Sequence, residues 1–184
     1  MFLIAHIGYT LLTAEIIAHL YYWLLLKKKN LEPTDSWGIV HFAFIPLIIG
    51  ALGPDIIDKL ISEPITGYGR YIGHSIPFAI LMFILFIVVF RKKPTVYSAL
   101  ILGWIMHIIL DTAGFIPWFF PFVNYTFQPK TQTYFQFLLQ PYVYYNEIGG
   151  FLSLVFLSIL YFRRGFTPKS FIQHVFTFTS KRFE

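Results

Sequence analysis

The chain has 184 residues, of which 57% are hydrophobic and only 12% are charged, and its mean hydropathy is +0.65. A typical soluble domain carries about 25% charged residues, so this composition excludes an ordinary water-soluble globular protein. Cysteine is absent, which excludes disulfide bonds and thiolate metal ligands. The net charge of +5 comes from short basic clusters between apolar runs. We interpret these clusters as signals for topology and anionic lipid, and we expect no nucleic-acid partner.

Five apolar runs are predicted to cross a membrane as helices. They cover residues 2–26, 37–52, 75–90, 95–117 and 146–162. Gly53–Pro54 is predicted to end the second run, while Ser75 is the predicted N-cap of the third, with Pro77 in its first turn. We therefore predict an all-α integral membrane bundle of about five transmembrane helices over residues 1–164. A basic, phenylalanine-containing cytoplasmic tail is predicted over residues 165–184.

The basic clusters predict the orientation of these helices. They follow the first, third and fifth runs, at residues 27–29, 91–93 and 163–164. The positive-inside bias places all three on the cytoplasmic side. We therefore expect a multi-pass protein of the cell membrane with residues 53–75 and 111–146 on the extracytoplasmic side. Whether the aromatic stretch 118–145 re-enters the membrane is left open by the sequence.

Histidines and carboxylates, which are costly in lipid, gather at the helix ends on that side. His107 and Asp111 form the sharpest pair, because an i,i+4 spacing puts both on one helical face. A metal ion can then bind one imidazole nitrogen and one carboxylate oxygen. The alternative is a buried histidine–aspartate pair that only joins helices by hydrogen bonding. The full set of candidate metal ligands is His6, Asp55, His74, His107, Asp111 and Glu147.

Two further residues are candidates for catalysis. Asp58 follows Asp55 by three residues and is the predicted base, with a helix cap as the alternative. Arg70 is the predicted phosphate clamp, because its planar guanidinium fork matches phosphate oxygens; the alternative is a solvated loop arginine. Among the ligand candidates, His6 could instead be a packing residue. Glu147, which opens the fifth predicted span, could instead be a carboxylate in the first turn of that helix, favoured by its dipole.

In chain order, these motifs resemble the YdjM family of membrane-bound, metal-dependent hydrolases. The family pattern is an early histidine, a Leu-Pro-Asp-x-Asp element, an Arg-x-x-x-His-Ser element and a His-x-x-x-Asp element. The matching residues are His6, Gly53–Pro54–Asp55, Arg70 with His74–Ser75, and His107 with Asp111. Two departures are that the second aspartate, Asp58, arrives one residue late and that Gly69 replaces a histidine. A more distant likeness to zinc-dependent phospholipase C implies zinc on Asp55, His74, His107 and Asp111, with Asp111 bridging.

These observations predict a membrane-embedded hydrolase that uses one or two divalent ions, with Zn²⁺ favoured by the mixture of imidazole and carboxylate ligands. A metal-activated water would cleave a phosphoester, from a membrane lipid or a small molecule. The alternative is a membrane metal-ion binding or transport protein. That function would require polar groups deeper in the membrane, where Glu15 and His19 are the only hint. A structural or partner-binding membrane protein without metal is a third reading.

Overall fold

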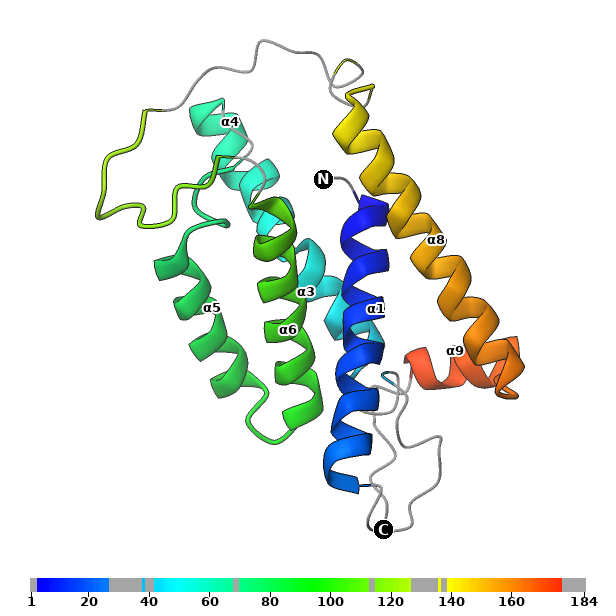
Figure 1. Cartoon of the computed structure of the whole chain (residues 1–184). Coiled ribbons are helices and arrows are strands. Elements are labelled where there is room, and N and C mark those ends of the chain that lie inside the picture. The colour runs from blue at the N-terminus through cyan, green and yellow to red at the C-terminus, as the bar shows by residue number, and fades with distance from the viewer. Residues whose placement is uncertain are drawn as a thin grey trace.

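The computed structural model of the chain is all-helical, with no strand among the residues that it describes, which are 3–26, 38, 42–67, 70–112, 115–126, 136 and 139–176. The predicted fold class is therefore confirmed. The first helix, α1, spans Leu3–Tyr21 and continues into a π-helical turn, η1 (Tyr22–Leu26). The other elements in chain order are α3 (Phe44–Ile57), η4 (Asp58–Ser62), α4 (Glu63–Thr66), α5 (Ile76–Val89), α6 (Pro94–Asp111), α8 (Pro141–Arg163) and α9 (Pro168–Phe176). Helices α1, α5, α6 and α8 stand alongside one another, and α9 lies across one end (Figure 1).

Three helices of the described chain are long and apolar enough to cross a membrane, namely residues 3–24, 94–111 and 141–163. Helix α5 is shorter but carries no polar side chain, and only its Ala79 is buried. Large apolar side chains on its surface, such as Leu81 and Val88, are more than half exposed. An apolar outer surface of this kind is stable when lipid, rather than water, surrounds the helix. Three of the five predicted spans thus meet both criteria of length and composition.

The prediction that Gly53–Pro54 ends the second span is wrong. Helix α3 begins at Phe44 and continues through Pro54 to Ile57, where the π-helical turn η4 takes over. A proline removes one backbone donor and disturbs the preceding turn. Here the packing of α3 on α6 outweighs that local preference, since Gly53 lies directly against the Trp104 ring. As a result Asp55 projects from a helix rather than from a loop.

Two other predicted boundaries also differ. Helix α6 ends at Asp111, whereas the sequence predicted a span to residue 117. The described residues 115–126 form no helix and return to the start of α5, where the Ile76 N–H donates to the Trp118 carbonyl at 2.8 Å. Helix α8 begins at Pro141, five residues before the predicted start, because a proline is well suited to a first helical turn.

Close helix contacts are made where glycines face one another's backbones. Gly103 of α6 lies against the backbone of α3, and Gly50 of α3 lies against the backbone at Leu100. Gly8 of α1 and Gly150 of α8 form the corresponding contact on the other side of α1. Small residues allow such approach, which drives helix association in lipid. These contacts set the register that brings the polar ends of α1, α3 and α6 together.

Candidate metal centre

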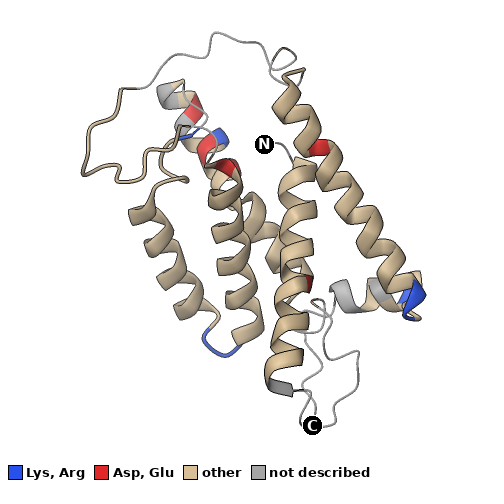
Figure 2. Ribbon diagram, viewed as in Figure 1, with Lys and Arg blue, Asp and Glu red and all other residues tan. Residues whose placement is uncertain are grey.

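Four chain segments meet at one end of the bundle and bring their polar side chains together. His6 comes from the second turn of α1, and Asp55 from the last turn of α3. His74 precedes the N-cap of α5, while His107 and Asp111 occupy the end of α6. Most of the acidic residues lie toward this end, whereas the basic turn between α5 and α6 and the basic end of α8 lie at the other (Figure 2).

Four residues each offer one ligand atom to a common point, namely Asp55, His74, His107 and Asp111. These four atoms all lie within 4.8 Å of one another. The two histidine Nε2 atoms are 3.0 Å apart, and Asp55 Oδ1 lies 3.8 and 3.7 Å from them. Asp111 Oδ2 completes the group at 3.3 and 3.9 Å from the same two nitrogens. A tetrahedral ion with bonds of roughly 2.0–2.2 Å separates its ligand atoms by about 3.3–3.6 Å, so the group has the dimensions of such a site.

The hydrogen bonds on the far side of each imidazole determine where its lone pair points. His107 Nδ1 lies 2.6 Å from the Ala51 carbonyl oxygen, which only accepts, so Nδ1 carries the hydrogen. His74 Nδ1 donates in the same way to Asp58 Oδ2 at 2.7 Å. In the neutral tautomers both Nε2 atoms are then acceptors, and they face each other and two carboxylates. A cation between them, either a metal ion or a proton, removes the repulsion between these acceptor atoms.

Asp58 lies behind His74, on the side away from the other three ligand atoms. The side chain is fully buried, and its carboxylate accepts the backbone N–H groups of Tyr71 and Gly73, each at 2.7 Å, as well as the His74 hydrogen bond. Burial alone would raise the pKa of Asp58, but these three hydrogen bonds hold it below its ordinary value. A carboxylate in this position orients a metal-binding histidine. Both oxygens of Asp58 accept hydrogen bonds here, and its role as the base stays a prediction.

The pKa of His74 is shifted in the opposite direction. Burial alone would lower the pKa, but hydrogen bonds to Asp111 and Asp58 raise it above its ordinary value. The site thus favours positive charge at the point where its acceptor atoms converge.

His6 and Arg70 contact the outer side of Asp111. The His6 Nε2 atom is 3.4 Å from Asp111 Oδ1, and its ring stacks on His107 with a centroid separation of 4.0 Å. His6 is completely buried, and neither ring nitrogen has a hydrogen-bond partner. Arg70 Nη2 lies 2.8 Å from Asp111 Oδ2, and this side chain is 27% exposed. Together with the partly exposed Asp55, Arg70 marks the side from which the site is reached.

Glu147 lies near this region but has a different contact. Its Oε2 atom accepts the N–H groups of Ile4 and Ala5, each at 3.2 Å, at the first turn of α1. A carboxylate there satisfies free helix donors and interacts favourably with the helix dipole. Glu147 is absent from the group of four converging ligands. The contact is with the first turn of α1, whereas the alternative stated above placed Glu147 in the first turn of its own helix, α8, which begins earlier, at Pro141.

Some functional groups of the site carry no signal in the sequence. The Ala51 carbonyl that orients His107, and the Tyr71 and Gly73 N–H groups that hold Asp58, are backbone atoms. Backbone atoms are common to nearly all residue types, so only the fold reveals which of them serve the site. Ser75, in contrast, was predictable: it caps α5 by accepting the Phe78 N–H, with proline in the first turn.

Fold and site together define a helical membrane protein with a buried histidine–aspartate cluster that could hold a metal ion. The family model described as YdjM inner membrane protein matches residues 6–171. The chain therefore belongs to the YdjM family, as its motifs predicted. No curated protein and no solved structure matches the chain significantly.

Proposed function

We propose that this protein is a membrane metal-dependent hydrolase that cleaves phosphoesters. The observation that carries the proposal is the convergence of two histidine lone pairs and two carboxylate oxygens on one point. Each carboxylate oxygen lies 3.3–3.9 Å from the two nitrogens, which are 3.0 Å apart. A cluster of acceptors this deep in a protein is costly unless a cation neutralises it. Membership of the YdjM family supports the same assignment.

Zinc is the metal that the donor set fits best. Imidazole nitrogens suit Zn²⁺, Cu²⁺, Fe²⁺ and Ni²⁺, whereas Mg²⁺ and Ca²⁺ prefer oxygen ligands only. Asp55, His74, His107 and Asp111 would hold this ion. His6, with its unpartnered nitrogens, would hold a second ion shared with Asp111 Oδ1, so that Asp111 bridges the two. When bound, such ions lower the pKa of water and polarise an ester.

The protein's own groups would then orient the substrate. Arg70 pairs with Asp111 through its Nη2 atom, and its guanidinium carries five N–H donors in all. Arg70 can therefore contact a phosphate oxygen while it stays paired. Asp58 would keep the His74 hydrogen on Nδ1 and the lone pair on Nε2. Burial of His6, His74, His107 and Asp111 would exclude bulk water from the reacting groups.

The position of the site supports an ester from the headgroup region of the membrane. The basic turn between α5 and α6 and the basic end of α8 lie at the opposite end of the bundle (Figure 2). By the positive-inside bias, the site would then be extracytoplasmic. Exposed apolar side chains of the 115–126 loop, including Phe119 and Phe122, lie at that end and would contact lipid.

The alternative is a metal-ion binding or transport protein. It would need polar groups that continue inward from the site. Glu15 follows His6 by nine residues, or about two and a half helical turns, and so faces the other side of α1. Thr10, one turn inward from His6, is the buried polar side chain between them on α1, and it carries no charge. The absence of a charged group in line with His6 on α1 favours hydrolysis over a continuous ion path.

The experiment compares metal content with turnover for protein purified in detergent. We expect wild-type protein to contain zinc and to hydrolyse at least one member of a panel of phospholipids and soluble phosphoesters. His107→Ala should lose both properties, because it removes a ligand from the centre of the cluster. His6→Ala should lower the metal content by about half if Asp111 bridges two ions.

His19→Ala is the matched control, since it removes an imidazole at the other end of α1 and should retain metal and turnover. A His107→Ala protein with full metal and full activity would refute the proposed site. Wild-type protein that binds zinc but cleaves nothing on the panel would instead support the metal-binding alternative.

A further inference from the structure

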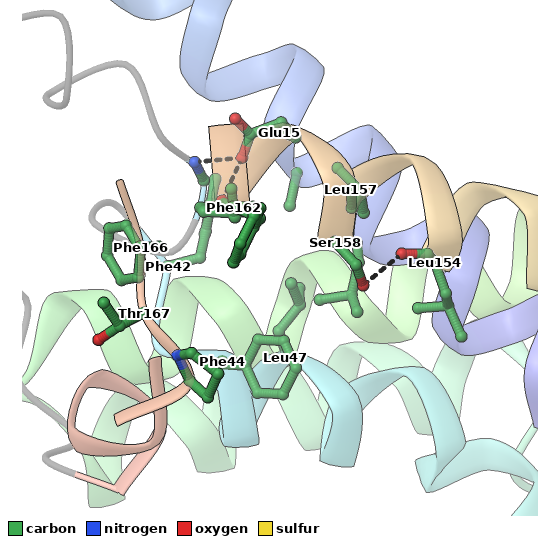
Figure 3. Close-up of a pocket in the computed structure, with 15 residues that line it drawn as sticks. Glu15, Phe42, Phe44, Leu47, Leu154, Leu157, Ser158, Phe162, Phe166 and Thr167 are labelled. Atoms are coloured by element: carbon green, nitrogen blue, oxygen red, sulfur yellow. Dashed lines mark hydrogen bonds between the residues drawn. The ribbon is translucent and has the colours of Figure 1, made fainter. Parts of the chain in front are cut away.

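A cavity of about 370 Å³ lies far from the metal centre, toward the basic end of the bundle. Helices α1, α3 and α8 and the turn before α9 enclose it, and Phe42, Phe44, Leu47, Leu157 and Phe162 form much of its wall (Figure 3). Binding pockets for small molecules and cofactors begin at about this volume. None of the metal-site residues lines it.

Most of the polar groups in the wall are already bonded to the protein. Glu15 Oε2 accepts the Gly38 N–H at 2.6 Å and the Tyr161 hydroxyl at 2.5 Å. Ser158 Oγ donates to the Leu154 carbonyl within α8, as Figure 3 also shows, and Thr167 bonds to Ser170 at the start of α9. The exception is Glu15 Oε1, which is buried without a hydrogen-bond partner and lies 3.3 Å from His19 Nδ1. The surface that is left for an occupant is mainly carbon, which favours an apolar chain over a polar solute.

The rim of the cavity carries positive charge. Arg163 and Arg164 lie in the sequence between Phe162 and Phe166, which both line the cavity. Both arginines are exposed. Arg164 Nη1 lies 3.0 Å from His19 Nε2, which holds its guanidinium near the end of α1. Lys169 follows on the first turn of α9 and is also exposed. Basic residues at the edge of a membrane helix attract anionic lipid headgroups.

From the apolar wall, the bonded polar groups and the basic rim, we infer that this cavity binds one acyl chain of an anionic phospholipid. The phosphate of that lipid contacts Arg163 and Arg164 at the rim. The lipid comes from the leaflet at the basic end, so it is distinct from any substrate at the metal centre. This inference does not depend on the proposed hydrolase activity, because no residue is shared between the two sites.

The test uses the full chain in phosphatidylcholine vesicles that contain a minor fraction of phosphatidylglycerol. Either lipid carries a photoreactive diazirine near the end of one acyl chain, and cross-linked peptides are identified by mass spectrometry. We expect phosphatidylglycerol to label peptides that contain Phe42 or Leu157 more strongly than phosphatidylcholine does. Replacing both rim arginines by Gln should lower this preference by roughly 25-fold, since each basic group contributes a factor of about five.

Arg91→Gln with Lys92→Gln is the matched control, because it removes two charges from the same end of the bundle but away from the cavity. Leu157→Trp, which fills the cavity, should remove labelling at Phe42 while metal content stays unchanged. Equal labelling by the two lipids in wild-type protein would overturn the anionic-lipid assignment. Labelling at Phe42 that persists in Leu157→Trp would show that the chain lies outside the cavity and would overturn the site itself.

Discussion

At the scale of single residues, the properties of the cluster come from how each side chain is held rather than from its type alone. His74 and His107 each have one nitrogen occupied by an acceptor, so that the other nitrogen presents a lone pair to the same point. Asp58 is therefore as important to the geometry as the four converging residues. Its carboxylate, bonded to two backbone N–H groups, cannot rotate away from His74 without leaving these donors unpaired.

A substitution at Asp58 tests this orienting role. Asp58→Asn places an amide NH₂ group against groups that are all donors, so we expect His74 to lose its fixed tautomer. Metal affinity should fall by roughly 10–100-fold, as for other partners of metal-binding histidines. Zinc affinity can be measured by competition with a chelator in detergent.

Glu15→Gln is the control for that measurement. It makes the same carboxylate-to-amide change at another buried position, where Gly38 and Tyr161 donate. Both variants should lose stability, but only Asp58→Asn should lose metal. Equal zinc affinity in the two variants would show that Asp58 has no role beyond packing.

At the scale of helices, the contact between α3 and α6 aligns the two halves of the cluster. Asp55 and the Ala51 carbonyl come from α3, while His107 and Asp111 come from α6. Glycines at the contact allow the two backbones to approach closely. The distance between Asp55 Oδ1 and His107 Nε2 therefore depends on residues that lie one or more turns away from either.

Gly103→Val tests this dependence. The new Cβ would overlap the α3 backbone at Leu47 and Ala51, so the helices must separate. We expect a loss of about 1–3 kcal/mol of stability, as for other overpacked contacts, together with a loss of bound metal. Thermal unfolding followed by circular dichroism, with zinc analysis of the same sample, measures both effects.

Ile109→Ala is the matched control on α6, because this side chain is 53% exposed and points away from the contact. It should retain the metal and most of the stability. A Gly103→Val protein that unfolds at the wild-type temperature with its metal in place would contradict the account of helix register.

At the scale of the whole molecule, the two ends of the bundle have different chemistry. Acidic and histidine side chains converge at one end, where Lys59 and Arg70 pair with Asp55 and Asp111, whereas the basic turn between α5 and α6 and the basic end of α8 lie at the other (Figure 2). The positive-inside bias then predicts that the metal centre faces the extracytoplasmic side. The absence of cysteine from the sequence makes a direct labelling test straightforward.

Single cysteines at the two ends provide this test. Phe122 is 81% exposed in the loop at the metal-site end, and Lys92 is exposed in the basic turn between α5 and α6. In intact cells, Phe122→Cys should react with a membrane-impermeant maleimide, whereas Lys92→Cys should react only after lysis. The reverse pattern would place the metal centre in the cytoplasm.

The sequence by itself determined the membrane class, the helical fold and the order of the polar motifs. These follow from local properties: long apolar runs need lipid, and the i,i+4 spacing of His107 and Asp111 places both on one face of any helix. The cap at Ser75 was likewise local, because its hydroxyl bonds within the same turn. The likeness to the YdjM family rested on the same ordered motifs and was confirmed by the match over residues 6–171.

Only the tertiary structure decided which of these residues meet and in what role. Helix α3 continues through Pro54 because packing on α6 outweighs a local preference, and this continuation directs Asp55 toward His107. Asp58 and Glu147 could not be assigned from the sequence, since a carboxylate orients a histidine, caps a helix or binds a metal according to the donors that surround it. Those donors are backbone N–H groups and a histidine from other segments, and chain folding alone brings them within hydrogen-bonding distance.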